Sequence, residues 1–335
     1  MSLVSRILKA NPSIQVSDVL AGTFTVPSAK AAFVDLIGNS ARALFGGGSD
    51  ASASTNIIDY FNIITLGNAT DFGDLVRSRQ ELAGNCSSST RALFDYNAKD
   101  SVFGWDYVTI ASTGNATNFG NFSLNMYEVA GLSSSTRGIF GGGRMDAPYV
   151  DISSRIEYIT IATTGNGTSF GDQNTGVRYC AGLASTTRGL FGGGYRNDGS
   201  NDRNEIQYVT IATTGNAQSF GTLTNAAYNL GAASSGTRGI FAGGNTDSGR
   251  INVINYVTIA TTGNATDFGD LSSTRSGIAG TSNNIRAVFG GGYDTAIRNF
   301  IDYILFASTG NAVDFGDLTV GRANVAANSA GHGGL

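Results

Sequence analysis

One phrase recurs six times along this chain of 335 residues, and it limits the possible fold more than any other feature. In its fullest form it reads YVTIATTGNATDFGDL, at residues 256–271. The Phe of its FG pair marks the copies, at Phe72, Phe119, Phe170, Phe220, Phe268 and Phe315. The copies therefore follow one another at intervals of 47 to 51 residues. A repeat of this regularity predicts one supersecondary unit per copy, each packed against its neighbours.

The repeated unit is composed of strands. Residues 177–223 read as an inner strand (VRYCAGLAS), a second strand (TTRGLFGGG), a third strand (EIQYVTIATT) and an outer strand (AQSFGTL). The third strand is apolar or β-branched on both sides, as expected where sheets pack on both faces. Helical repeats of similar length need an apolar stripe at helical spacing, which this chain lacks. The sequence thus predicts an all-β, six-bladed propeller of four-stranded antiparallel blades over residues 41–335, after an N-terminal arm or docking segment at residues 1–40.

The ends of the repeat suggest how the ring closes. Residues 322–329, RANVAANS, have the sequence of an inner strand but no further blade follows them. The first blade, which starts at Arg42, lacks an inner strand of its own. A C-terminal strand in that place would remove the exposed sheet edges. Residues 32–41 could fill the same place, and we favour residues 322–329.

Several residue types recur with the phrase and have both a structural and a functional interpretation. Gly-Asn ends the third strand in every copy, which favours a hairpin turn in which Gly supplies a positive φ. Four of these Asn residues are also glycosylation sequons, but the other two copies keep the turn without the sequon. An Arg begins each second strand, at Arg42, Arg91, Arg137, Arg188, Arg238 and Arg286. A ring of Arg could bind an anion, but hydrogen bonds to carbonyls between blades are the favoured interpretation.

The residues available for catalysis are few. The only His, His332, lies in the terminal AGHGGL, so neither a metal site of several His residues nor a His-based triad inside the ring is expected. Cys86 and Cys180 fall two blades apart, beyond disulfide distance. Asp pairs flank FG in three copies and could bind calcium, although capping of a turn is the favoured role. Trp105 is expected in the core. We therefore expect no enzyme, no cofactor and no metal ion.

The composition argues against nucleic-acid-binding and membrane-spanning proteins. The formal net charge is -4 and charged residues are 14% of the chain, so there is no basic footprint for nucleic acid. No apolar run approaches the roughly 20 residues that a membrane span requires. The first residues lack the apolar stretch of a signal peptide, so we expect synthesis in the cytoplasm of the host cell.

These residues also carry a resemblance to a known family. RSGIAGTSNNIRAVFGGG (275–292), Tyr303 and Phe315 resemble the kelch repeat, with Phe where kelch units usually carry Trp, and the match extends over residues 42–329. The combination of the motifs RGLFGGG and IATTGNATDFGDL is similar to that of kelch-like propellers in virion structural proteins of tailed bacteriophages, especially cyanophages. Galactose oxidase has a kelch-like fold as well, but its copper ligands include His residues that this chain cannot supply.

The resemblance implies a non-enzymatic virion protein: a tail fibre, baseplate or neck appendage component for host attachment. Its partners would be other virion proteins, reached through the arm or the propeller, and a host-surface glycan. Two alternatives remain open. One is a carbohydrate-binding or carbohydrate-active propeller, and the other is an intracellular kelch-type adaptor.

The binding residues are expected in the loops that follow the Gly clusters. These loops join the same two strands of each blade, so they should gather on one face, and recognition usually lies on such loops. The longest loops belong to blades 3 and 4, and Tyr and Arg are enriched where binding energy is concentrated. The predicted binding residues are Arg144, Tyr149, Tyr195, Arg196 and Asp198.

Overall fold

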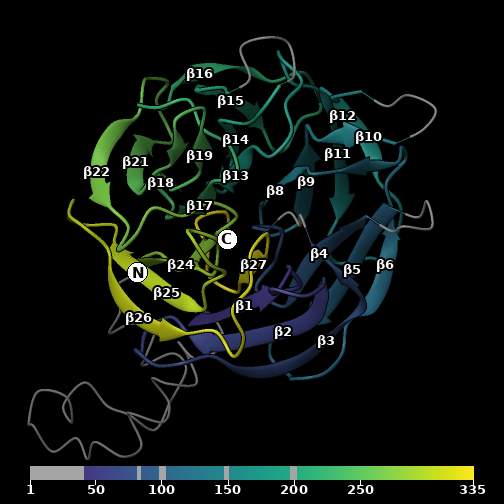
Figure 1. Ribbon diagram of the computed structural model, residues 1–335. Helices are drawn as coiled ribbons and strands as arrows, with labels where there is room; N and C mark the ends of the chain where they lie inside the picture. The colour runs from purple at the N-terminus through teal and green to yellow at the C-terminus, as the bar shows by residue number, and fades with distance from the viewer. Residues whose placement is uncertain (1–40, 81–83, 98–102, 147–150, 197–201) are drawn as a thin grey trace, which may run out of the picture. The chain divides into compact units, whose positions relative to one another are not determined.

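The computed structural model describes residues 41–80, 84–97, 103–146, 151–196 and 202–335. Internal contacts divide the chain into Met1–Ser40 and Ala41–Leu335, and the predicted arm lies outside the described residues. Every element in the described ranges is a β-strand. Six sheets stand around one axis (Figure 1), so the predicted all-β, six-bladed propeller is confirmed.

The blades follow one another in chain order, and the strands of each blade are named from the axis outward. Blade 1 contains β27 (Ala326–Ser329), β1 (Arg42–Gly46), β2 (Thr55–Asn62) and β3 (Thr70–Arg79). Blade 2 contains β4 (Arg91–Asn97), β5 (Phe103–Thr109) and β6 (Thr117–Asn121). Blade 3 contains β8 (Ala130–Ser133), β9 (Arg137–Gly141), β11 (Arg155–Thr160) and β12 (Thr168–Asp172).

The second half of the ring repeats this order. Blade 4 contains β13 (Ala181–Ala184), β14 (Arg188–Gly192), β15 (Glu205–Thr210) and β16 (Gln218–Thr222). Blade 5 contains β17 (Gly231–Ser234), β18 (Arg238–Ala242), β21 (Val253–Thr258) and β22 (Thr266–Asp270). Blade 6 contains β23 (Ala279–Ser282), β24 (Arg286–Gly290), β25 (Phe300–Leu305) and β26 (Val313–Asp317). Two short ribbons are formed by β7 (Met126–Tyr127) with β10 (Arg144–Met145), and by β19 (Asn245–Thr246) with β20 (Gly249–Arg250).

Blade 1 is built from both ends of the propeller. β1 pairs antiparallel with β2 on one side and with the C-terminal β27 on the other, where Ala43 lies opposite Ser329. Both edges of β1 are therefore occupied. The described residues of blade 2 form three regular strands, and a bridge between Ser87 and Ala92 lies on their inner side.

A buried Phe in the second strand of each blade packs against the neighbouring blade. These residues are Phe45, Phe94, Phe140, Phe191, Phe241 and Phe289. A Cβ on Gly46 would lie 2.6 Å from the ring of Phe94, and one on Gly192 would lie 2.7 Å from the ring of Phe241. A larger residue would force the blades apart, because protein interiors are close-packed. In blades 1, 3, 4 and 6 the Gly after this Phe therefore makes room for the ring of the neighbouring blade, whereas blade 2 has Asp95 and blade 5 has Ala242 at this position.

The recurring Arg residues connect adjacent blades, as expected from the sequence. Arg188, for example, donates from Nη1 to the carbonyls of Ile259 and Ala260 in the next blade, at 2.9 Å each. Its guanidinium lies 4.4 Å from the ring centroid of Tyr208, and Tyr208 meets Phe220 edge-on. All six of the recurring Arg residues reach a carbonyl of the following blade in this way. The prediction of a structural ring of Arg is therefore confirmed.

The sequence that recurs six times forms three hydrogen bonds between adjacent blades, and we call this set of bonds the inter-blade clasp. At the first junction, Gly114 N–H donates to the carbonyl of Phe72 (2.8 Å) and Ala116 N–H to that of Asp74 (2.7 Å). In return Asn115 Oδ1 accepts from Asp74 N–H at 3.1 Å. The same three bonds recur at every junction, including the one that closes blade 6 onto blade 1. Gly-Asn therefore pairs with the outer strand of the preceding blade.

Gly-Asn lies between the third and outer strands as expected, but the connection is longer than the predicted two-residue hairpin turn: in blade 4, β15 ends at Thr210 and β16 begins at Gln218. Tight hairpin turns need φ values near +60° to +90°. The turn glycines Gly67, Gly114, Gly215 and Gly310 have the positive φ expected of Gly, but its value of 149–157° lies beyond the range of these tight turns. What the site requires is close approach of two chains: a Cβ on Gly221, in the outer strand of blade 4, would lie 2.1 Å from the carbonyl oxygen of Gly263. The Gly of the FG pair makes room for the clasp.

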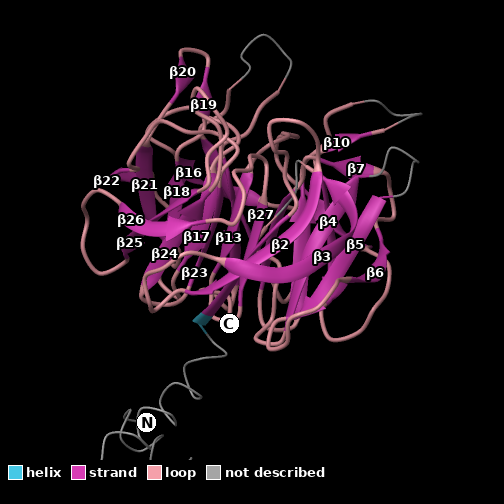
Figure 2. Cartoon of the chain, turned by 60° about the horizontal axis from the view of Figure 1, so that its bottom comes forward, coloured by secondary structure: helices cyan, strands magenta, loops and turns pink. Residues whose placement is uncertain are grey.

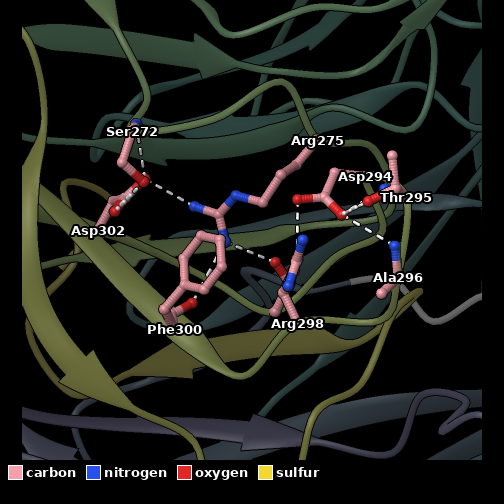
Figure 3. A network of polar contacts seen from close by, with 9 residues as sticks. Ser272, Arg275, Asp294, Thr295, Ala296, Arg298, Phe300 and Asp302 are labelled. Carbon is pink, nitrogen blue, oxygen red and sulfur yellow. Dashed lines mark hydrogen bonds and ion pairs between the residues drawn. The ribbon is translucent and has the colours of Figure 1, made fainter.

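A buried polar side chain of the third strand connects each blade to the one before it. These residues are Asp59, Asp106, Glu157, Gln207, Asn255 and Asp302, and each accepts a backbone N–H of the preceding blade. Where the residue is Asp, a buried Arg pairs with it. In the junction of blades 5 and 6, Arg275 Nη2 lies 2.7 Å from Asp302 Oδ2, and both groups are buried (Figure 3).

Candidate binding site at the axis

The two faces of the propeller differ. The loops between second and third strands, and the connections between blades, lie on one face, which we call the loop face. The ribbons β7–β10 and β19–β20 belong to it, and Figure 2 shows them on the side of the ring opposite the C-terminus. The connections between first and second strands lie on the other face, which we call the turn face.

The C-terminal tail, residues 330–335, closes the axis at the turn face. Gly333 N–H donates to the carbonyl of Ser234 (2.8 Å), and a Cβ on Gly334 would lie 1.9 Å from the carbonyl oxygen of Ser133. His332 is 3% exposed. Its Nδ1 accepts from Gly334 N–H, so Nε2 carries the proton and lies 3.1 Å from the carbonyl of Ser87. Burial lowers the pKa of His332 to about 4, which keeps the ring neutral.

A funnel opens at the loop face and ends inside the ring. A cavity of about 60 Å³ at its mouth is lined by the polar residues Glu128, Tyr179, Asn229 and Asn324 and by an apolar collar beneath them, Val129, Leu230, Ile278 and Val325. A second cavity of about 60 Å³ lies on the axis and is lined mainly by Gly and Ala of the inner strands. Asn85 borders this second cavity, and its amide donates across to the carbonyls of Gly182 (3.0 Å) and Ala232 (2.9 Å).

Along the rim of the funnel, backbone hydrogen bonds link five of the connections between blades. Tyr179 N–H donates to the carbonyl of Glu128, Asn229 N–H to Tyr179, Gly277 N–H to Asn229, and Asn324 N–H to Gly277, at 2.7–3.1 Å. All five residues have φ between 55° and 64°. This left-handed region suits Gly and Asn, but it is uncommon for other residues and disfavours bulky side chains. Among these five described residues, Glu128 and Tyr179 are therefore the unusual members; the matching residue between blades 1 and 2 lies outside the described residues.

The side chains of these two residues meet. The hydroxyl of Tyr179 donates to Glu128 Oε1 at 2.7 Å, and Arg178 Nη1 donates to Glu128 Oε2 at 3.1 Å. Burial alone would lower the pKa of Arg178, but the Glu128 carboxylate outweighs it and the pKa is raised. Arg178 is therefore charged, and the pair is electrically balanced.

An aromatic cluster extends this arrangement outward over blades 4 and 5. The Arg178 guanidinium lies 5.0 Å from the ring centroid of Tyr179 and 4.9 Å from that of Tyr195. Tyr228 lies 5.2 Å from Tyr195 in an edge-on arrangement and 6.2 Å from Tyr179. Aromatic side chains with polar tips are frequent in binding surfaces, because they offer both apolar area and a hydrogen-bonding group. We refer to Glu128, Arg178, Tyr179, Tyr195 and Tyr228 as the axial cluster.

The predicted binding residues are placed differently by the structure. Tyr195 belongs to the axial cluster, and the half-buried Arg196 follows it. Arg144 lies in β10 of blade 3, opposite Tyr127, in the ribbon next to Glu128. Tyr149 and Asp198 lie outside the described residues. The role of these residues in binding stays a prediction.

Sequence reasoning missed four members of the axial cluster because it considered only the loops after the Gly clusters. Glu128, Arg178, Tyr179 and Tyr228 lie in the connections from one blade to the next. The sequence did contain a signal for this site. Glu128, Tyr179 and Asn229 each follow the Phe of FG by nine residues, at a position where the residue type differs between copies of the repeat.

The remaining reactive groups do not assemble into a metal site. Within the described ranges, no three His, Cys, Asp or Glu side chains gather closely enough to hold a metal ion. Cys86 and Cys180 are both buried and unbridged, as expected. Cys180 lines the funnel, but burial raises its pKa to about 12, so its thiol stays protonated at neutral pH. Trp105 is fully buried, as predicted. The described ranges also contain no helix long and apolar enough to cross a bilayer.

Comparison with known proteins supports the fold. The structure of YjhT is similar to this chain with a TM-score of 0.61 and 10% sequence identity, over 76% of this chain and 88% of that chain. At this identity the likeness concerns the propeller fold alone. No protein-family model matches the sequence, and no curated protein matches it.

Proposed function

We propose that this protein is a non-enzymatic binding propeller of a phage virion, a component of a tail fibre, baseplate or neck appendage. It binds another virion protein or a host-surface glycan through the axial cluster on its loop face. The phage assignment rests on the resemblance of the repeated sequence to virion propellers. The binding role rests on the axial cluster.

One observation carries the binding role. Asn or Gly is enough for the left-handed backbone conformation at the rim, because Asn229, Gly277 and Asn324 adopt it. Glu128 and Tyr179 hold the same conformation at a cost of roughly 1 kcal/mol or more each. Strained residues of this kind concentrate at functional sites. At the rim they bring a carboxylate and a phenol to the mouth of the funnel, and Arg178 pairs with the carboxylate.

The location of the protein tests the virion assignment. An antibody raised against residues 41–335 is used to probe phage particles purified from the cells that produce the chain. We expect labelling of the tail or neck region by immunogold microscopy and a band of 34.6 kDa in the particle proteins. A chain found only in the soluble fraction of the lysate, with none in washed particles, would overturn the assignment and favour the intracellular adaptor.

A further inference from the structure

We propose that the mouth of the funnel binds one neutral sugar residue at the end of a glycan, that Glu128 and Tyr179 contact it, and that Arg178 holds Glu128 in place. This inference rests on the proposed function of the propeller as a binding module and names the ligand class of the same site. Three properties of the mouth support it: its charge, its free hydrogen-bonding capacity and its shape.

The charge of the mouth favours a neutral ligand. Glu128 and Arg178 compensate each other, with their side chains 5% and 23% exposed. The other polar groups at the rim are the amides of Asn229 and Asn324 and the phenol of Tyr179. An anion would compete with Glu128 for Arg178, and a cation would compete with Arg178 for Glu128. Breaking such a partly buried pair is costly because one charge is left without a partner.

The hydrogen-bonding groups suit hydroxyls. A carboxylate has about four acceptor positions. The bonds that Glu128 accepts from Tyr179 and Arg178 occupy one position on each oxygen. The amides of Asn229 and Asn324 line the same cavity. Sugar hydroxyls both donate and accept, so a single sugar residue can donate to the carboxylate and exchange hydrogen bonds with these amides. A methyl or aromatic ligand without polar groups would satisfy neither.

The shape of the funnel limits how much of the ligand enters. A cavity of about 60 Å³ has room for a substituent of a sugar ring but not for the ring itself. The collar of Val129, Leu230, Ile278 and Val325 offers apolar contact to C–H groups. Asn85 and the C-terminal tail obstruct the axis below. A glycan chain cannot thread through, so the ligand is a terminal residue whose ring rests against Tyr179.

The test uses the full chain and free sugars. Saturation-transfer NMR is recorded with D-glucose, D-galactose, D-mannose and L-fucose at millimolar concentration, and with D-glucuronate as a charged probe. We expect transfer to at least one neutral sugar and none to D-glucuronate. Absence of transfer to every neutral sugar, or stronger transfer to D-glucuronate, would overturn the proposal.

The critical variant is Tyr179→Asn, because Asn occupies the matching positions 229 and 324 with the same backbone conformation. We expect at least a tenfold loss of sugar affinity, together with a melting temperature equal to or above that of the parent chain. The control is Tyr293→Ala, which removes an exposed Tyr at the blade 6 position that matches Tyr195. It should leave sugar binding unchanged. Unchanged affinity in Tyr179→Asn would refute the assignment of the site.

Failure of this inference can be distinguished from failure of the proposed function. If the chain is present in particles and attaches through Tyr179 but binds no sugar, the partner is a protein; the sugar inference then fails while the virion role stands. If the chain binds a neutral sugar but is absent from particles, the sugar inference stands and the virion role fails.

Discussion

At the scale of single residues, one inter-blade clasp contains two glycines with opposite requirements. A Cβ on Gly221 would lie 2.1 Å from the carbonyl oxygen of Gly263, whereas a Cβ on Gly263 would meet nothing within 4 Å. We expect Gly221→Ala to lower the free energy of unfolding by roughly 3 kcal/mol, through overpacking and loss of the clasp bonds. Gly263→Ala should change it by less than about 1 kcal/mol. Urea denaturation of the two variants measures the difference, and equal effects would contradict the clasp.

A second residue-scale prediction concerns His332, whose pKa is lowered to about 4 by burial. The unfolded chain has a His pKa near 6.5, so below that pH it binds a proton that the folded chain does not. This contribution to stability is complete above pH 6.5 and is lost as the pH falls toward 4. We expect it to lower the free energy of unfolding by about 2 kcal/mol between pH 7 and pH 5.

The matched variant is His332→Gln, which cannot titrate in this range. Urea denaturation at pH 7, 6 and 5 should show a decrease with falling pH that is smaller in the variant by about 2 kcal/mol. If parent and variant lose stability equally over this range, His332 is not the buried neutral group that closes the turn face.

At the scale of elements, the junction of blades 5 and 6 depends on the buried pair Arg275–Asp302. Asp302 also accepts a hydrogen bond from the Ser272 hydroxyl at 2.8 Å, and the Arg275 guanidinium lies 4.3 Å from the ring centroid of Phe300 (Figure 3). Asp302→Gln leaves Arg275 buried without a counter-charge, and we expect a loss of about 3–5 kcal/mol. Blade-to-blade attachment at this junction is electrostatic as well as apolar.

The chain itself supplies the compensating change. At the junction of blades 3 and 4, the matching positions are held by Val177 and Gln207, both buried. The double variant Arg275→Val with Asp302→Gln should therefore recover at least half of the loss, since an uncharged pair replaces a charged one. Guanidinium chloride denaturation of single and double variants measures the coupling. A double variant no more stable than the single would show that the junctions are not interchangeable.

Most strands were predictable because the repeat states each element six times. The Phe of the second strand, the Arg before it and the Gly-Asn after the third strand each fixed a position in the blade. What the repeat could not show is where its hydrogen bonds go. Gly-Asn was expected to close a hairpin, but Asn115 bonds to Asp74 of the preceding blade, a partner 41 residues away. Local turn chemistry does not contain that information.

At the scale of the whole molecule, repeated and irregular residues separate in space. The repeated phrases hold the blades together, and the residues that vary within the repeat line the axis at the loop face. The sequence singled out Tyr195 because its loop is long, and the structure places it in the axial cluster. Glu128 and Tyr179 could not be predicted, since only the folded ring brings connections of different blades to one mouth and shows the strain of their left-handed backbone.

The separation of scaffold and site is the central claim, and one paired measurement tests it most directly. Sugar affinity and melting temperature are determined on the same preparations of the parent chain, Gly221→Ala and Tyr179→Asn. We predict that Gly221→Ala lowers the melting temperature and keeps the affinity of the folded protein. Tyr179→Asn should keep or raise the melting temperature and lower the affinity at least tenfold. Affinity and melting temperature that fall together in Tyr179→Asn, or an affinity lost in Gly221→Ala while the chain is still folded, would contradict this separation.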